Sequence, residues 1–148
     1  MAQAFPLQVV LDVARDRLEA ASGELQRLRQ QWVDAQSKLD QLIGYQREYA
    51  SGLQERLASG MPSHLLGDYR LFLDKLARAV RAQTEEVQRR QQAWEREHVQ
   101  WLKLRQKEQA LAVLLQRHQT AQQRLDSRRE QKQQDEFALK NAKRTPMR

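Results

Sequence analysis

The residues that could carry out chemistry are few and lie far apart in this sequence. The chain has three histidines, His64, His98 and His118, and no cysteine. No two histidines stand at metal-ligand spacing, and there is neither a glycine-rich phosphate loop nor a Ser, His and Asp set typical of hydrolases. The lack of cysteine also excludes a disulfide framework and a thiol nucleophile, and it suits the cytoplasm. We therefore predict a protein that is not an enzyme, holds no metal and needs no cofactor.

Basic side chains are the next candidates for a function. The chain has 26 Lys and Arg against 19 Asp and Glu, a net charge of +7, with a pI near 10.1. In the C-terminal part, the carboxylates of Asp126, Glu130, Asp135 and Glu136 alternate with the cations, so no clean basic stripe for a phosphate backbone is formed. This counts against nucleic acid as a partner, although a basic coiled coil that binds nucleic acid remains an alternative. No window of the chain approaches a membrane span.

The aromatic residues fall into two groups. Trp32, Trp94 and Trp101 recur at heptad a positions, so we expect them in a helix seam rather than in a stacking platform for nucleotides. Tyr45 and Phe72 fall at g positions, which share one edge of an antiparallel helix pair. They either cover the seam, which composition alone slightly favours, or form an exposed patch for a protein contact.

Heptad repeats predict the elements that position these residues. The first helix has an apolar residue at nearly every a and d position, interrupted at Gln46, and a second ladder follows the Gly60 to Pro62 break. The first ladder consists of Leu11, Leu18, Leu25, Trp32, Leu39 and Leu53 with Ala14, Ala21, Leu28, Ala35, Leu42 and Tyr49. The second consists of Leu66, Leu73, Val80, Val87, Trp94 and Trp101 with Tyr69, Leu76, Leu104, Leu111 and Leu125.

The predicted fold class is all-α, a long two-helix antiparallel coiled-coil hairpin with a C-terminal helical overhang. We expect one coiled-coil domain over residues 1–148, with a first helix at 5–58, a turn at 59–63, a second helix at 64–142 and a disordered tail at 143–148. Pro6 suits the first helical position and Gly60 suits a helix end. A self-assembling structural coiled coil, with the seam formed between chains, is a further alternative.

Folding back at the turn predicts which residues meet. Ala35 should lie by Val87, Leu11 by Leu111, Tyr49 by Leu73, Leu28 by Trp94 and Ala21 by Trp101, so small residues often face large ones. The same register makes weak layers of Leu25 with Glu97 and Ala14 with Glu108. Because the first helix runs out, residues 119–143 should project without a partner helix.

Two segments carry a resemblance to a known family. They are Leu42-Ile43-Gly44-Tyr45-Gln46-Arg47-Glu48-Tyr49 and Gln133-Gln134-Asp135-Glu136-Phe137-Ala138. Together with Tyr69, Phe72 and Leu76 across the turn, they resemble the FliJ family of bacterial flagellar export proteins over nearly the whole chain.

The resemblance implies a non-enzymatic component of the flagellar type III export apparatus, similar to the central stalk of rotary ATPases. It implies three protein partners: the hexameric export ATPase, the cytoplasmic domain of the export gate protein, and the export chaperones. It also implies a cytoplasmic protein that associates with the inner face of the cell membrane at the flagellar base only through these partners.

The resemblance further implies two contact sites. The gate-binding face would be formed by Leu42, Tyr45, Tyr49, Phe72, Leu76 and Ala79. The ATPase contact would lie at the ends away from the turn, and within the tail at Arg124, Arg128, Arg129, Lys132 and Phe137. Lys38 and Gln83 depart from the family pattern of Gln and His, so the rim of the gate-binding face should differ in charge and strength.

Overall fold

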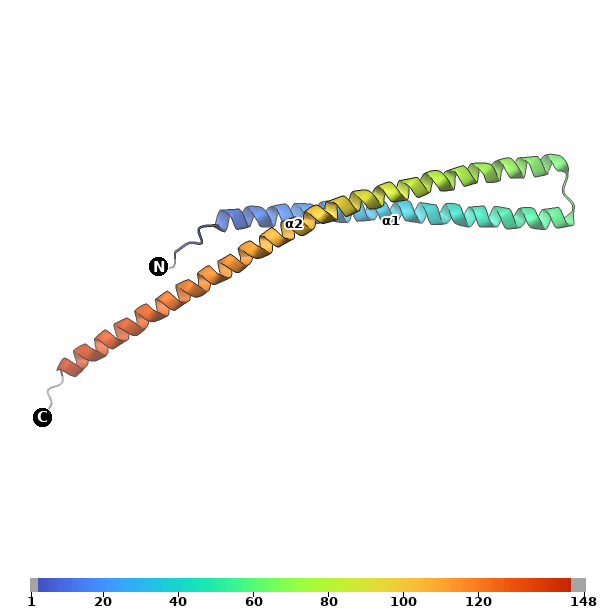
Figure 1. The fold of residues 1–148 in the computed structure, drawn as a ribbon. Coiled ribbons are helices and arrows are strands. Elements are labelled where there is room, and N and C mark those ends of the chain that lie inside the picture. The colour runs from blue at the N-terminus through green and yellow to red at the C-terminus, as the bar shows by residue number, and fades with distance from the viewer. Residues whose placement is uncertain (1–2, 145–148) are drawn as a thin grey trace. The chain divides into compact units, whose positions relative to one another are not determined.

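A computed structural model describes residues 3–144 and places them in two helices and their flanking segments. Helix α1 spans Gln8–Ser59 (52 residues) and helix α2 spans Ser63–Arg144 (82 residues), which confirms the predicted all-α fold (Figure 1). Contacts group the chain into two compact units. We call Glu19–Leu102 the turn unit, and residues 1–18 with 103–148 the terminal unit. Each unit contains a segment of both helices, and each is described separately.

The first helix begins three residues later than the sequence suggests. Phe5 to Leu7 form a turn in which the Gln8 N–H donates to the Phe5 carbonyl oxygen at 3.1 Å. Regular helical bonding follows, with the Leu11 N–H donating to the Leu7 carbonyl oxygen at 2.9 Å. Proline disfavours the helical conformation of the residue before it, which keeps Phe5 outside the helix.

The two helices of the turn unit are joined by residues 60–62. Gly60 has a φ of 88°, a left-handed conformation that glycine adopts without steric cost, and its N–H lies 3.4 Å from the Leu57 carbonyl oxygen. The Pro62 carbonyl oxygen then accepts the Leu66 N–H at 3.2 Å as α2 begins. The break predicted from Gly60 and Pro62 is therefore confirmed, with Ser59 and Ser63 inside the helices.

In the turn unit, α1 and α2 pack along a narrow seam. Ala35, Leu39 and Val87 form a buried cluster, so Ala35 and Val87 meet as predicted. Trp94, which the register places beside Leu28, packs on Trp32, with ring centroids 5.6 Å apart. Helical side chains tilt toward their own N-terminus, so in an antiparallel pair these two large rings lean toward each other along the groove.

The terminal unit pairs the start of α1 with the second half of α2. Leu11, Ala14 and Leu111 are its buried core, and Leu11 is fully buried, so the pairing of Leu11 with Leu111 is confirmed. The sequence analysis expected a weak layer of Ala14 with Glu108. In the structure Ala14 belongs to this buried core, and the Glu108 carboxylate accepts a hydrogen bond from Arg15 at 3.4 Å.

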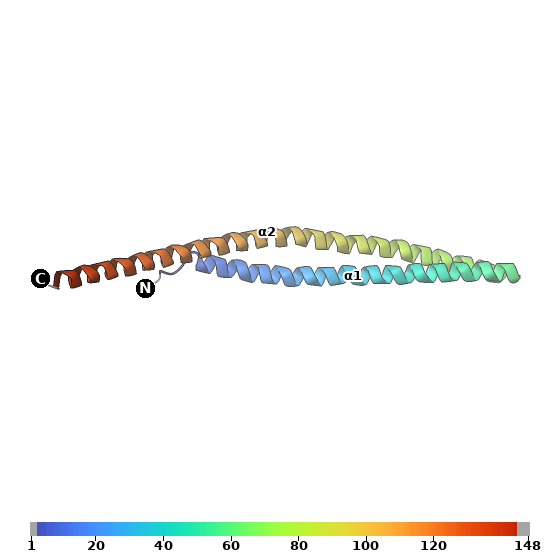
Figure 2. The same cartoon turned by 90° about the horizontal axis from the view of Figure 1, so that it is seen from below.

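Helix α2 continues past the start of α1 within the terminal unit (Figure 2). Every described residue from 123 to 144 is exposed, including Leu125 at a d position of the second ladder, as expected for a segment without a partner helix. The predicted disordered tail began at residue 143, yet Lys143 and Arg144 are helical, where cations favour the negative end of the helix dipole. The rest of that tail, 145–148, lies outside the described residues.

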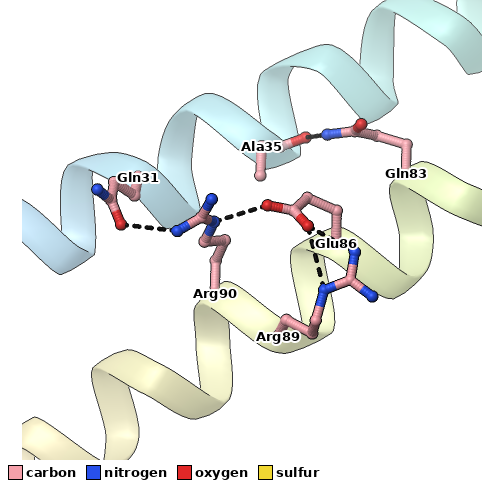
Figure 3. Close-up of polar contacts among 6 residues, drawn as sticks. All are labelled: Gln31, Ala35, Gln83, Glu86, Arg89 and Arg90. Atoms are coloured by element: carbon pink, nitrogen blue, oxygen red, sulfur yellow. Dashed lines mark hydrogen bonds and ion pairs between the residues drawn. The ribbon is translucent and has the colours of Figure 1, made fainter.

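A polar network links the two helices beside the turn-unit core (Figure 3). Arg90 donates to Gln31 at 3.0 Å and to Glu86 at 2.7 Å, and Arg89 donates to the same carboxylate at 2.6 Å. The hydrogen bonds from Arg89 and then Arg90 hold the pKa of Glu86 below its ordinary value. Glu86 thus orients Arg90 toward α1.

The turn-unit core gives a first prediction. Leu39→Ala should lower the free energy of unfolding by about 2–3 kcal/mol, because it removes buried methyl groups and leaves a gap beside Val87. The matched control Val33→Ala, at an exposed valine of the same helix, should change it by less than about 0.5 kcal/mol. Urea denaturation followed by circular dichroism measures both. Equal losses would contradict the assigned core.

The Glu86 network gives a second prediction, on pH. Because the folded-state pKa of Glu86 is lowered, its stabilising contribution is present above the unfolded pKa, near 4.5, and is lost as the pH falls through the folded value. Glu86→Gln should therefore have a lower melting temperature than the parent at neutral pH and the same one in strong acid.

The control for this prediction is Glu85→Gln, which makes the same charge change at an exposed neighbouring position. Melting curves recorded across the acid range compare the three proteins. A difference between parent and Glu86→Gln that persists unchanged in strong acid would show that the carboxylate does not act through its charge.

Candidate functional site

The residues of the predicted gate-binding face all lie in the turn unit, where they differ in exposure. Tyr49 contacts Phe72 across the helix pair, with ring centroids 4.6 Å apart. Tyr45 lies one helical turn from Tyr49 and is 52% exposed, and Phe72 is 41% exposed. Leu76 is buried, so it supports the face from beneath. We call the surface formed by these six residues the aromatic face: Leu42, Tyr45, Tyr49, Phe72, Leu76 and Ala79.

The aromatic face extends toward the turn by residues that the sequence analysis did not assign to it. A shallow groove of about 220 Å³ is lined by Tyr49, Leu65, Asp68, Tyr69 and Phe72. Tyr69 had been placed only in the seam, whereas its ring also lies 6.5 Å from that of Tyr49. Leu65, Tyr69 and Phe72 stand four and three residues apart, a spacing that places them on one helix face and could have revealed the groove.

Arg56 lies over Tyr69, one of the rings that line this groove. Its guanidinium carbon lies 5.1 Å from the centre of the Tyr69 ring, within the range of a cation–π contact. A cation over the ring keeps Tyr69 half-buried in place and puts a positive charge next to the aromatic face. No periodicity in the sequence signals this contact, since Arg56 and Tyr69 come from opposite sides of the turn.

Gln83, one of the two departures from the family pattern, is engaged between the helices. Its side-chain Nε2 donates to the carbonyl oxygen of Ala35 at 2.9 Å, and the residue is half-buried (Figure 3). The amide therefore ties α2 to α1 at the level of the core cluster. Lys38, the other departure, is exposed.

The three tryptophans line the seam of the turn unit, as predicted. The Trp94 ring stacks on the His98 ring, and the His98 ring stacks on Trp101, with ring centroids 5.9 Å apart. Trp101 Nε1 donates to Ser22 Oγ at 2.8 Å. All three indoles are half-buried and packed on neighbouring side chains. The three indoles are therefore engaged in contacts within the helix pair.

The predicted ATPase-contact residues lie on the exposed end of α2 in the terminal unit. Phe137 is 67% exposed, which is unusual for a phenylalanine. No second helix packs beside it, so its apolar ring points to a contact with another protein. The cations assigned to the same contact are Arg124, Arg128, Arg129 and Lys132, all exposed. This segment thus presents one aromatic ring among separated positive charges.

The described residues contain neither a metal-binding cluster nor a membrane-spanning stretch. Within residues 3–144, no group of three or more His, Asp or Glu side chains is placed to hold a metal ion. Neither described helix contains a stretch long and apolar enough to cross a bilayer.

A solved structure has a similar arrangement of helices. It is that of a putative YscO homolog from Chlamydia trachomatis, with a TM-score of 0.52 and 21% sequence identity, and the match covers 95% of this chain and 96% of that chain. At this identity the likeness concerns the fold alone.

Sequence comparisons are more specific. The family model described as Flagellar FliJ protein matches residues 3–146. The flagellar FliJ proteins of Escherichia coli (strain K12) and of Salmonella typhi are each 30% identical over 146 residues, covering 99% of this chain and 99% of the relative. With a full-length family match and two relatives that it spans almost end to end, this chain belongs to the flagellar FliJ protein family.

Proposed function

We propose that this protein is a non-enzymatic component of the flagellar type III export apparatus that binds two partners through separate surfaces. The aromatic face in the turn unit binds the cytoplasmic domain of the export gate protein. The exposed end of α2 in the terminal unit binds the hexameric export ATPase. Export chaperones are further partners, and the protein acts in the cytoplasm at the flagellar base.

The aromatic face is the observation that carries this proposal. Tyr45, Tyr49 and Phe72 are exposed. Because the chain is very polar, with a mean hydropathy of −0.88, these rings stand out from the surface around them. Tyrosine and other large aromatic residues are enriched among the side chains that dominate binding energies. Tyr49 and Phe72 also hold each other at 4.6 Å, which limits the conformational entropy lost on binding.

The gate contact is tested by Tyr45→Ala combined with Phe72→Ala. Both rings are substantially exposed, so the double variant should keep its helicity, while binding to the purified cytoplasmic domain of the gate protein weakens about a hundredfold or more. Calorimetric titration measures the affinity and circular dichroism the fold.

The matched control for the gate contact removes similar apolar surface elsewhere in the turn unit. Val33→Ala combined with Leu71→Ala changes two exposed residues that are not part of the aromatic face. This control should bind the gate domain normally. A Tyr45 and Phe72 double variant that binds as tightly as the control would remove the aromatic face from the gate contact.

The support for the ATPase contact is the exposed end of α2. A single helix in water is marginally stable by itself, so a segment without a partner helix gains order by binding another surface. Its cations carry charge that attracts carboxylates, and Phe137 supplies an apolar anchor between them. These properties suit the changing subunit surfaces of an ATPase ring.

Truncation after Thr120 tests this contact. The cluster of Leu11, Ala14 and Leu111 with Leu115 is retained, so the remaining helices should stay paired, while stimulation of the ATPase should fall severalfold. Phosphate release by the purified ATPase is the readout, with binding of the gate domain as the internal control. Full stimulation by the truncated protein would exclude the removed segment from the ATPase contact.

A further inference from the structure

The first turns of α1 expose three valines side by side. Val9 is 74% exposed, and Val10 and Val13 are also exposed. Valine is neither a strong helix former nor a usual surface residue, because its branched Cβ loses rotamer freedom in a helix. Helix formation therefore does not explain why three valines stand at the start of α1 in so polar a chain. An exposed apolar patch of this kind marks an interaction site.

The valines form one wall of a groove within the terminal unit. We call it the valine groove, lined by Val9, Val10, Val13, Ala14 and Arg17 from α1 and by Leu104 and Lys107 from α2. Its volume is about 170 Å³. Pockets for drug-sized ligands measure roughly 300–1,000 Å³. The valine groove is therefore of a size for one or two side chains of a protein partner.

The charged side chains that line the valine groove are both cations. Arg17 comes from α1 and Lys107 from α2, so each helix contributes one. The neighbouring carboxylate of Glu108 is already engaged by Arg15 at 3.4 Å. A partner that fills the groove would therefore gain most from carboxylates placed next to its apolar side chains.

The charge distribution of the whole chain favours the same kind of partner. Residues 1–18 and 103–148 hold fourteen of the 26 Lys and Arg and seven of the 19 Asp and Glu. The terminal unit thus has a net charge of +7, the full net charge of the protein, and the turn unit is neutral. Long-range attraction of an acidic partner is directed to the terminal unit.

We propose that the valine groove binds an acidic amphipathic helix of a partner protein. Apolar side chains at i, i+3 or i+4 of that helix lie against Val9, Val13 and Leu104, and flanking Asp or Glu pair with Arg17 and Lys107. Nucleic acid would pair with the cations but leave the valines in water, so it fits only half of the surface.

This inference rests on a surface other than the aromatic face and other than the five α2 residues assigned to the ATPase contact. The aromatic face lies in the other unit, and the ATPase-contact residues line no part of the valine groove. Loss of gate binding would leave the valine groove intact, and loss of groove binding would leave the aromatic face intact. The two proposals can therefore fail separately.

The test uses three synthetic helical peptides and the full-length protein. The first has leucines along one face with glutamates beside them, the second replaces the glutamates with lysines, and the third keeps the glutamates but replaces the leucines with serines. Fluorescence anisotropy of the labelled peptides measures their affinity. We expect the first peptide to bind at least about tenfold more tightly than either of the others, and less tightly as salt is raised.

Paired variants assign the binding to the valine groove. Val9→Ser with Val13→Ser should weaken binding of the acidic leucine peptide about tenfold, and Arg17→Glu with Lys107→Glu should reverse the preference between the acidic and basic peptides. The controls are Val33→Ser, at an exposed valine of the turn unit, and Arg81→Glu with Arg96→Glu, which makes the same charge change there. Circular dichroism verifies that each variant keeps its helicity.

Several outcomes would overturn the proposal. They are equal binding of the acidic and basic peptides, binding that survives the valine substitutions, and binding lost equally in the controls. Sedimentation showing that the valines instead mediate self-association, or valine-dependent binding to anionic lipid vesicles with no binding of the peptides, would assign the groove to another occupant and also refute it.

Discussion

The antiparallel packing of two narrow apolar seams is the interaction on which this structure depends. The buried apolar side chains of the described residues form small clusters, such as Ala35, Leu39 and Val87 in the turn unit, rather than one continuous core. A pair of helices can cover only one stripe of each partner. The remaining apolar side chains must face water or a binding partner, so the same packing that holds the helices together also leaves surfaces available for binding.

Polar contacts supplement the seam where it is thin. The Gln83 amide bonds the Ala35 backbone, and Arg90, oriented by Glu86, bonds Gln31, so side chains of α2 reach α1 at adjacent levels. A seam formed only of leucines and alanines could shift by one heptad at modest cost, whereas directional hydrogen bonds fit one register. The position of every exposed side chain on the turn unit follows from that register.

This member of the flagellar FliJ protein family differs from an ordinary helix pair mainly in its exposed side chains. The turn unit presents aromatic rings and no net charge, while the terminal unit presents valines, Phe137 and the whole net positive charge of the chain. Two units with such different surfaces suit partners of different chemistry. The proposed gate contact and the valine groove are examples of these two chemistries.

The sequence by itself determined the helices, the turn at Gly60 and Pro62, and the pairing of Ala35 with Val87 and Leu11 with Leu111. Heptad spacing and a helix break are local signals, and one fold-back then determines which residues meet. The tertiary structure decided what depends on side-chain reach: the packing of Trp94 on Trp32, the bond from Gln83 to Ala35, and the contacts of Tyr69 with Tyr49 and Arg56. Periodicity gives the direction in which a side chain leaves its helix, but its burial depends on which neighbours from the other helix reach over it.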